Sequence, residues 1–388
     1  MAQLWSASAA RLVDRIDRGL VAGTLHATLP DGSTRMLGGR APGFEATVTL
    51  HAWGGLVRVA RAGSVGLYQA WEAGEWSSPD PVQLFALFVA NADALGGLAR
   101  AHGPWRWAGR LVHWLHRNTR RGSQRNIHAH YDLGNDFYAA WLDPELVYSS
   151  ARFAGPGQDL AAAQQHKLDA IAQRLQGAKT VLEIGCGWGA LAQRLHLAGM
   201  NVTAISLSDA QLDWARRQRS GAIDFRKQDY RDVTGQFDAI ASVEMVEAVG
   251  REFWPDYFAC LARCLNNGGR AAIQYIAIRE ELFPAYARSA DFIQTYIFPG
   301  GMLVSEAEFR ALAAQHGLDW RDQEDFALDY AETLKAWREN FDLALAEGRL
   351  PPHFDARFQR LWRFYLMYCE GGFRGEGITV AQVTLVKS

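Results

Sequence analysis

Residues 181–189 combine residue types and a spacing suited to holding a nucleoside cofactor. An apolar run contains Glu183 and is followed by three glycines, Gly185, Gly187 and Gly189, which alternate with larger residues. Glycine permits backbone conformations and a close approach of a ligand that a Cβ atom would block. At the carboxyl end of a first parallel strand, such a turn forms a slot for a nucleoside. We therefore predict a cofactor site built on this turn.

The spacing of these glycines distinguishes two classes of cofactor. It reads Gly-x-Gly-x-Gly, whereas the turn that holds the pyrophosphate of a dinucleotide reads Gly-x-Gly-x-x-Gly. S-adenosylmethionine has no pyrophosphate, and Glu183 lies inside the expected strand, two residues before the first glycine. The turn therefore favours S-adenosylmethionine as the cofactor.

The turn needs a sheet to position it, and from residue 165 onward strand-like and helix-like segments alternate. The expected strands are 180–184, 202–206, 223–227, 238–243 and 271–276, with a late strand at 377–386. The segments between the first few of these strands are amphipathic, which predicts helices. The expected fold class is α/β: a doubly wound, mostly parallel, Rossmann-like sheet with a small α+β N-terminal domain.

The first hundred residues contain no cluster of catalytic residue types, and we expect an accessory domain over residues 1–103. Its expected elements are a short helix at 10–19 and strands at 23–29, 46–50 and 56–60. Residues 130–388 form the expected catalytic domain. Within it, an excursion rich in proline and glycine at about 280–305 is a candidate lid.

Residues 104–129 form a basic bridge between these two domains, with six arginines, three tryptophans and no acidic residue. Tryptophan prefers the headgroup level of a membrane, and basic side chains near an anionic surface gain about 1 kcal/mol each. The bridge therefore predicts docking on an anionic membrane surface. The alternative, which the sequence leaves open, is a solvated linker helix with ordinary packing tryptophans.

Composition limits the class of protein. The 388 residues suffice for two domains, and a net charge of −2 argues against a nucleic-acid binder. The four cysteines include no Cys-x-x-Cys pair, so neither a zinc site nor a disulfide framework is indicated. Without a signal peptide or a long apolar stretch, we expect a cytoplasmic protein, peripheral on the inner face of the membrane. The sequence does not decide whether the chain forms a homodimer.

From residue 130 to the C-terminus the chain resembles the cyclopropane fatty acid synthase family, which includes the mycolic acid cyclopropane synthases. The resemblance rests on the glycine turn and on the segments 130–138, 142–144, 148–151, 206–211, 228–232, 242–250, 296–301 and 369–374. The N-terminal domain and the basic bridge resemble the longer bacterial members, in which such a domain is linked to lipid access.

The resemblance implies a set of cofactor-binding residues in four groups along the chain. These are Tyr148 and Ser149 before the sheet; Glu183, Gly185, Cys186, Gly187 and Gly189 in the turn, at the amino-acid end of the cofactor; Ser206, Leu207 and Gln211 at the ribose; and Tyr230 and Arg231 at the adenine.

The resemblance also implies an activity: transfer of a methyl(ene) group from S-adenosylmethionine to the double bond of an unsaturated acyl chain in a membrane phospholipid. An alkene is a poor nucleophile, so orientation and exclusion of water supply much of the acceleration. The attack leaves a carbocation. Loss of a proton from the added methyl closes a cyclopropane, the product implied first. Loss of a different proton gives a methylene branch, which reduction would turn into a methyl branch.

Two other classes of function stay open. A methyltransferase for a small molecule or a nucleic acid is one, although residues 242–245 lack the Asn/Asp-Pro-Pro-Tyr loop that serves an exocyclic amine. A non-catalytic lipid carrier is the other, and such a carrier need not bind S-adenosylmethionine.

Family members are understood to use a bound bicarbonate as the base, held by a cysteine, a glutamate, histidines and a tyrosine. Glu247 and Tyr330 match that set, whereas Ser150, Ala248 and Gln274 stand at the cysteine position and at two histidine positions. Losing these groups weakens an anion site, which makes bicarbonate a doubtful cofactor for this chain.

Glu244 stands three residues before Glu247, where the family has a glycine. A second carboxylate weakens an anion site further through like-charge repulsion. We predict that Glu244 replaces bicarbonate as the base or as a stabiliser of the cation. The alternative is that Glu244 caps the following helix or forms a salt bridge. Cys369 matches a cysteine sometimes proposed as catalytic, but the mechanism needs no thiolate, so a packing role is its other interpretation.

The basic bridge gives a testable prediction. Replacing Arg117, Arg120 and Arg121 together by glutamate should reduce sedimentation with anionic liposomes. Binding of the wild type should fall as salt rises, because exposed charges are screened. Wild-type protein that ignores anionic liposomes at low salt would contradict membrane docking.

Overall fold

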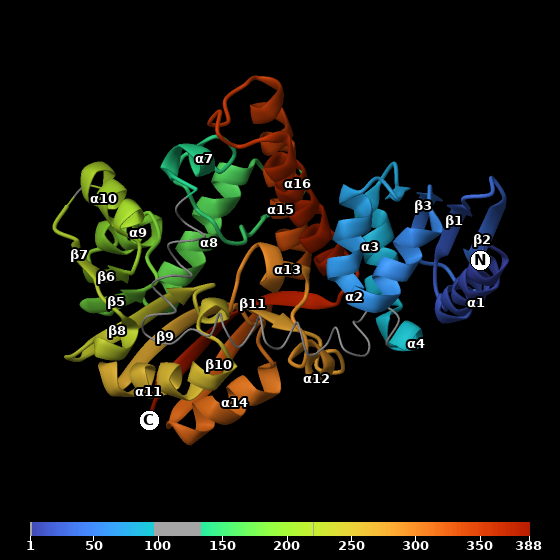
Figure 1. Cartoon of the computed structure of the whole chain (residues 1–388). Coiled ribbons are helices and arrows are strands. Elements are labelled where there is room, and N and C mark those ends of the chain that lie inside the picture. Colours follow the sequence, from blue (N-terminus) through green and yellow to red (C-terminus); the bar gives the residue numbers. More distant parts are fainter. Residues whose placement is uncertain (1, 97–132, 220) are drawn as a thin grey trace. The chain divides into compact units, whose positions relative to one another are not determined.

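The computed structural model describes residues 2–96, 133–219 and 221–388, and the chain divides into two compact units (Figure 1). The first unit comprises residues 1–115, 279–299 and 355–378, and the second comprises 116–278, 300–354 and 379–388. The basic bridge at 104–129 lies outside the described residues, so its membrane role stays a prediction. Among the described residues, no helix is both long and apolar enough to cross a membrane.

The second unit is built on a seven-stranded sheet with the order β10-β11-β9-β8-β5-β6-β7. The strands are β5 (Thr180–Ile184), β6 (Asn201–Ser206), β7 (Asp224–Lys227), β8 (Phe237–Val243), β9 (Leu265–Ile278), β10 (Leu318–Asp325) and β11 (Ile378–Lys387). β5 to β9 pair in parallel, whereas β10 and β11 are antiparallel. The predicted mostly parallel sheet is confirmed, and the six predicted strands correspond to β5 to β9 and β11. Strand β10, whose sequence is largely polar, was not predicted, and β9 begins at Leu265, earlier than expected.

Helices cover both faces of this sheet. On one face, α8 (Leu160–Arg174), α9 (Ala190–Leu197) and α10 (Asp209–Gln218) bury a core against β5, β6 and β8. On the other face lie α11 (Trp254–Cys264) and α14 (Glu306–Gln315), where Phe309 contacts Trp254 and Tyr275 of β9 (Figure 1). The unit is completed by α7 (Asn135–Ala139) and α15 (Ala327–Ala346). This layering is the doubly wound arrangement, in which parallel strands are buried on both faces.

The first unit contains a four-stranded sheet with the order β2-β1-β3-β4. Its strands are β1 (Thr24–Thr28), β2 (Thr34–Gly38), β3 (Glu45–Leu50) and β4 (Trp76–Ser77). Its helices are α1 (Ala2–Gly19), α2 (Trp53–Glu72), α3 (Pro81–Ala90), α4 (Ala92–Leu95), α12 (Phe283–Tyr286), α13 (Phe292–Tyr296) and α16 (Ala356–Arg374).

The strand predicted at 56–60 is wrong, because these residues lie in helix α2. A short apolar run does not by itself distinguish a strand from a buried helix segment. Here the run continues as helix to Glu72, with one kink at Gly63, where φ is 59°.

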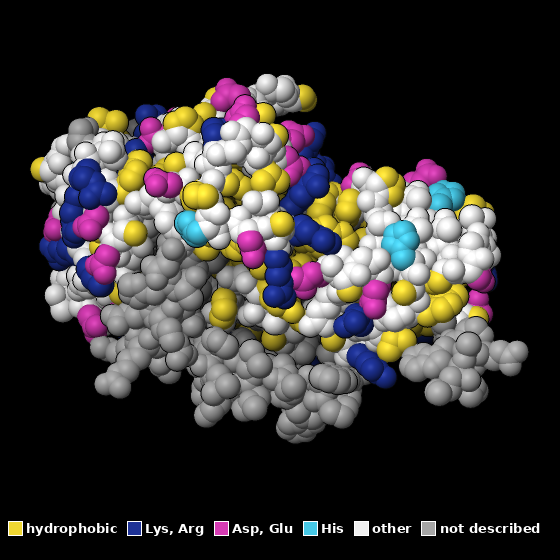
Figure 2. Space-filling view, turned by 45° about the horizontal axis from the view of Figure 1, so that its top comes forward, with side chains coloured by type: hydrophobic (Ala, Val, Ile, Leu, Met, Phe, Trp, Pro, Cys, Tyr) yellow, Lys and Arg dark blue, Asp and Glu magenta, His cyan; other side chains and the backbone are white. Residues whose placement is uncertain are grey.

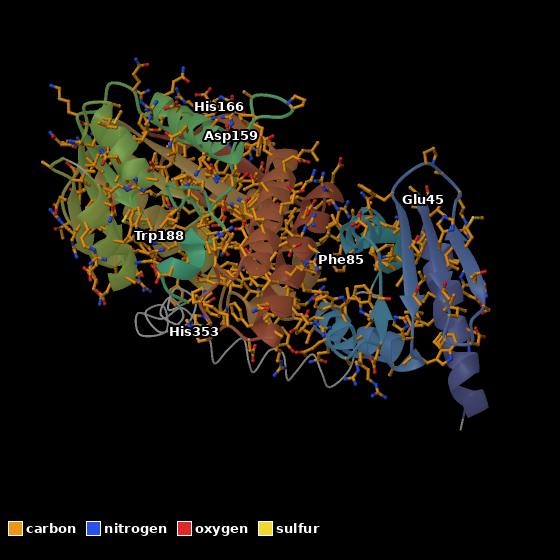
Figure 3. The ribbon with its side chains drawn as sticks, turned by 90° about the horizontal axis from the view of Figure 1, so that it is seen from above. Glu45, Phe85, Asp159, His166, Trp188 and His353 are labelled. Atoms are coloured by element: carbon orange, nitrogen blue, oxygen red, sulfur yellow. The ribbon has the colours of Figure 1, made fainter. Side chains whose placement is uncertain are left out.

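Residues from the C-terminal part of the chain belong to the first unit because an aromatic cluster gathers them there. Tyr68 of α2 lies 5.1 Å from Phe292 of α13, and Phe85 of α3 lies 5.3 Å from Phe364 of α16, measured between ring centroids (Figure 3 labels Phe85). Gly371 lets α16 approach closely, since a Cβ atom there would come within 2.4 Å of Phe85. The units therefore interleave along the sequence, and the candidate lid at 280–305 contributes residues to both. Its role as a lid stays a prediction.

The surface in Figure 2 carries basic and acidic side chains interspersed on the face in view. Such mixing accords with the net charge of −2.

Candidate active site

A cavity of about 190 Å³ lies in the second unit at the carboxyl ends of β5, β6 and β8. This edge of a doubly wound sheet is where such folds bind ligands. All the predicted cofactor residues except Gly189 line the cavity: Tyr148, Ser149, Glu183, Gly185, Cys186, Gly187, Ser206, Leu207, Gln211, Tyr230 and Arg231. The sequence therefore brings together one site from four separate segments.

The glycine turn is shaped by left-handed backbone conformations. Gly187 has a φ of 51°, and a Cβ atom built on it would meet nothing within 4 Å, so this position opens onto free space. Gly185, with a φ of 84°, has Met245 so close that a Cβ atom would lie 2.6 Å from its side chain. The backbone amides of Gly185 and Cys186 both donate to the carbonyl of Ile205 at 3.0 Å, which ties the turn to β6.

Gly189 has a different role, because it does not line the cavity. It is the N-cap of α9 with a φ of 77°, and a Cβ atom there would lie 2.8 Å from the ring of Phe225. The glycine therefore lets α9 pack closely. Trp188, which the sequence reasoning did not select, does line the cavity (Figure 3). Its ring nitrogen donates to Asn135 of α7 at 2.9 Å and so anchors the turn.

The predicted ribose and adenine groups are held by local hydrogen bonds. Ser206 donates to the side-chain oxygen of Gln211 at 3.3 Å, and Gln211 is buried. Asp229, another residue missing from the prediction, forms a half-buried ion pair with Arg231 at 2.6 Å. The Arg231 guanidinium in turn lies 5.5 Å from the ring centre of Tyr230. Arg231 is thereby fixed in place at the cavity wall.

A buried lysine at the cavity wall was also missed. Lys167 of α8 is 1% exposed, and its ammonium donates to the hydroxyl of Ser149 at 2.7 Å. One turn earlier, Gln164 donates to the Ser149 carbonyl at 2.9 Å. Burial lowers the pKa of Lys167 to about 8, against the opposing pull of nearby carboxylates. The signal was present in the sequence, because Lys167 lies four residues before Ile171 on the apolar face of its helix.

Glu244 is held by donors from three directions. One carboxylate oxygen accepts from the Ser150 amide at 2.9 Å and from the Gln274 side chain at 2.8 Å, and the other accepts from the Tyr330 hydroxyl at 2.7 Å. Burial raises the pKa of Glu244, and these three hydrogen bonds oppose the rise. The helix that follows, η3 (Val246–Ala248), has no side-chain cap, and none of the three donors belongs to it. Among the described residues, Glu244 also forms no salt bridge. The helix-cap and salt-bridge interpretations therefore do not describe this side chain.

The backbone at Glu244 has a conformation that favours glycine. Its φ is 47°, in the left-handed region that residues with a Cβ atom rarely adopt. A glutamate therefore occupies this position at a conformational cost, which its three hydrogen bonds offset.

Glu247 lies beside this group but outside the cavity lining. One of its oxygens accepts from the Ile276 amide, and the other is buried with no hydrogen-bond partner among the described residues. Burial and the charge of Glu244 raise the pKa of Glu247 to about 8. Of the two carboxylates, Glu244 is thus the one whose ionised form is stabilised.

Cys369 is not among the residues that line the cavity, and it belongs to α16 of the first unit. Burial, followed by the charge of Asp291, raises the pKa of its thiol. A thiol with a raised pKa carries little thiolate at neutral pH. These surroundings favour the packing role for Cys369.

Comparison with known proteins identifies the family. The family model described as mycolic acid cyclopropane synthetase matches residues 118–383. The chain is 37% identical over 356 residues to tuberculostearic acid methyltransferase UfaA1 of Mycobacterium tuberculosis, covering 85% of this chain and 80% of that protein. It is 33% identical over 338 residues to the cyclopropane-fatty-acyl-phospholipid synthase of Escherichia coli, covering 84% of each.

A solved structure gives the same result. Mycolic acid cyclopropane synthase CmaA1, in complex with SAH and CTAB, superposes with a TM-score of 0.64 at 28% identity, over 68% of this chain and 98% of that one. The residues matched by the family model include the glycine turn and Glu244. This chain belongs to the mycolic acid cyclopropane synthetase family.

Proposed function

We propose that the chain transfers the methyl group of S-adenosylmethionine to the double bond of an unsaturated acyl chain in a membrane phospholipid. The observation that carries the proposal is Glu244, a carboxylate fixed by three donors at the wall of the cavity. A preorganised anion is suited to a cation that forms on the acyl chain. Relatives named for fatty-acid methylation and for cyclopropane formation on phospholipid support this class of substrate.

The cavity residues fit S-adenosylmethionine, whose amino-acid end is a zwitterion. The Lys167 ammonium can only donate, so the Ser149 hydroxyl oxygen accepts a hydrogen bond from it. The O–H group of Ser149 is then available to donate to a ligand. Together Lys167 and Ser149 are suited to a carboxylate. Glu183 has one buried oxygen without a hydrogen-bond partner among the described residues, and this oxygen is suited to an ammonium group. When bound, the cofactor supplies an electrophilic methyl group.

In this proposal Glu244 has two roles. Its ionised carboxylate first stabilises the positive charge on the acyl chain, and it then accepts the proton that the cation loses. The Tyr330 hydroxyl and the Gln274 amide hold the carboxylate in one orientation. The chain thus carries its own base where the family is understood to bind bicarbonate. Glu247, with a pKa of about 8, stays mostly protonated at neutral pH and leaves the charge on Glu244.

The product depends on which cation Glu244 deprotonates. Loss of a proton from the added methyl of the first cation closes a cyclopropane. If a 1,2-hydride shift first moves the positive charge onto the chain carbon that carries the new methyl, loss of a proton from that methyl gives a methylene branch, and no further reactant is needed. We favour the methylene branch for two reasons. The Glu244 carboxylate is tethered to the chain, so it reaches the cation from a different direction than a bound bicarbonate would. In addition, a relative at 37% identity is named a tuberculostearic acid methyltransferase. Cyclopropane is the second candidate, supported by the likeness to the Escherichia coli synthase.

The carboxylate-binding role of Lys167 predicts a selective loss of affinity. Lys167→Met should weaken binding of S-adenosylmethionine about ten-fold or more, because a hydrogen-bonded charge is removed. It should leave binding of decarboxylated S-adenosylmethionine unchanged. Isothermal titration calorimetry with both ligands measures the difference.

Two variants serve as controls for that measurement. Lys179→Met removes an exposed lysine and should bind both ligands normally. Gly187→Val fills the open space beside the turn and should bind neither. An equal loss of both ligands in Lys167→Met would show that Lys167 does not recognise the carboxylate.

The role of Glu244 predicts a loss of rate without a loss of cofactor binding. Glu244→Gln should lower kcat on the order of a hundred-fold or more, because a base is removed. Affinity for S-adenosylhomocysteine should change little. Removing bicarbonate from the buffer should not affect the wild type, since the base is part of the chain.

The assay uses vesicles of unsaturated phospholipid with methyl-labelled S-adenosylmethionine. Mass spectrometry counts the transferred group, and proton NMR separates ring protons from vinylidene protons, since the two products are isomers. Glu332→Gln, which changes an exposed glutamate of α15, is the matched control. Full activity in Glu244→Gln, or a strict need for added bicarbonate, would remove Glu244 from the mechanism.

A further inference from the structure

A line of hydrogen bonds runs from Glu244 across strands β9 and β11 to Arg152. Gln274 of β9 donates to Glu244 at 2.8 Å. Gln382 of β11 donates to the side-chain oxygen of Gln274 at 3.0 Å. Arg152 donates to the side-chain oxygen of Gln382 at 3.2 Å. Both glutamines are 1% exposed, so water does not compete for these bonds.

The chemistry at the two ends of this line fixes the direction of both amides. A glutamine amide presents a donor at one side and an acceptor at the other, and either orientation fits the same space. A guanidinium only donates, so Gln382 must turn its oxygen toward Arg152 and its NH₂ group toward Gln274. Gln274 must then turn its own NH₂ group toward Glu244. With Gln274 reversed, an amide oxygen would face the carboxylate and repel it.

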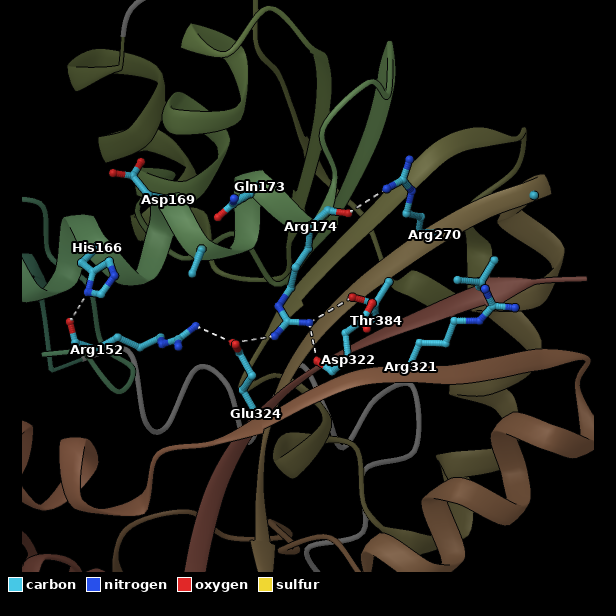
Figure 4. A pocket seen from close by; sticks show the side chains of 13 residues that line it. Arg152, His166, Asp169, Gln173, Arg174, Arg270, Arg321, Asp322, Glu324 and Thr384 are labelled. Carbon is cyan, nitrogen blue, oxygen red and sulfur yellow. Dashed lines mark hydrogen bonds and ion pairs between the residues drawn. The ribbon is translucent and has the colours of Figure 1, made fainter. Parts of the chain in front are cut away.

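Arg152 is itself held firmly in place. Its guanidinium pairs with Glu324 at 2.9 Å and lies 5.2 Å from the ring centre of Phe326. Arg174 pairs with the same carboxylate at 2.8 Å (Figure 4). Although burial acts in the opposite direction, Arg152 and Arg174 keep the pKa of Glu324 below its ordinary value, so this carboxylate stays ionised. The outer end of the line is therefore anchored by a permanent charge.

We infer that Arg152 is a positioning residue for Glu244, acting through Gln382 and Gln274. This inference rests on the proposed role of Glu244 as the base. Arg152 keeps a hydrogen-bond donor in front of the carboxylate, which stabilises its ionised form and fixes its orientation. Neither Arg152 nor Gln382 belongs to the cofactor cavity.

The influence of Arg152 on the ionisation of Glu244 adds to the influence of the other groups that face this carboxylate. The titratable or charged ones are Lys167 from α8, Glu247 from η3 and Tyr330 from α15. Breaking the line leaves these three in place. The pKa of Glu244 should then rise, because one donor to its ionised form is lost or reversed.

The test compares Arg152 and Arg174, two arginines that line the pocket shown in Figure 4. Arg152→Met and Arg174→Met each remove one partner of Glu324, but only Arg152 contacts Gln382. In Arg152→Met the acid limb of the kcat profile should move up by about one pH unit, with kcat about ten-fold lower on that side. Affinity for S-adenosylhomocysteine should not change. In Arg174→Met the acid limb should stay where it is in the wild type.

Further variants secure the result. Gln382→Met breaks the line at similar volume and should shift the limb as Arg152→Met does, which serves if the arginine variant fails to fold. Arg152→Lys keeps a group that can only donate hydrogen bonds, so it should restore part of the wild-type dependence of kcat on pH. Equal shifts of the acid limb in Arg152→Met and Arg174→Met would overturn the inference, and so would an unchanged titration of Glu244 in both Arg152→Met and Gln382→Met.

A second readout separates this inference from the proposed function. The infrared band of the protonated Glu244 carboxyl, identified by its absence in Glu244→Gln, reports the titration of this group without any turnover. If the band titrates at higher pH in Arg152→Met while the kcat profile is unmoved, Arg152 does position Glu244, and it is the role of Glu244 as the base that fails. If the band does not move, the positioning role fails even where the lipid product is formed.

Discussion

The second unit depends on satisfying one half-buried carboxylate, that of Glu244. Its donors are Ser150, Gln274 and Tyr330, which lie 94, 30 and 86 residues away along the chain. The left-handed backbone at this position costs roughly 1–2 kcal/mol. Hydrogen bonds to an ionised group contribute roughly 1.5–3 kcal/mol each, so three of them offset this backbone cost, while burial still raises the pKa of Glu244. The segment before α8, strand β9 and helix α15 must all be in place for this balance to hold.

Two further charged side chains of the cavity are buried and need partners of opposite charge. Lys167 and Glu183 are both buried, and burial moves the pKa of each to about 8, from opposite sides. In the proposed function a zwitterionic ligand adds a carboxylate beside Lys167 and an ammonium beside Glu183 to the opposite charges that already act on them. The cavity therefore favours a ligand that carries both signs, and the low dielectric of the site strengthens each pairing.

The first unit shows a second way in which distant segments depend on one another. Its aromatic cluster draws Phe292 and Phe364 from the C-terminal part of the chain onto Tyr68 and Phe85. The chain therefore enters this unit three times. A single cut near residue 103 would not release it, because the cluster that stabilises it is shared between the two halves of the sequence.

Local sequence determined the sheet and the glycine turn. Runs of apolar residues predicted β5 to β9 and β11 but not the largely polar β10. The glycines at 185 and 187 have the positive φ angles that the turn requires. Strand propensity and backbone freedom are encoded in neighbouring residues, so both could be predicted from the sequence. Folding alone decided the polar partners. Lys167 meets Ser149 only when α8 packs against the segment before it, and Arg152 and Gln382 acquire a role only when β9 and β11 lie side by side. Such contacts join residues far apart in the chain, so packing determines them and local pattern does not.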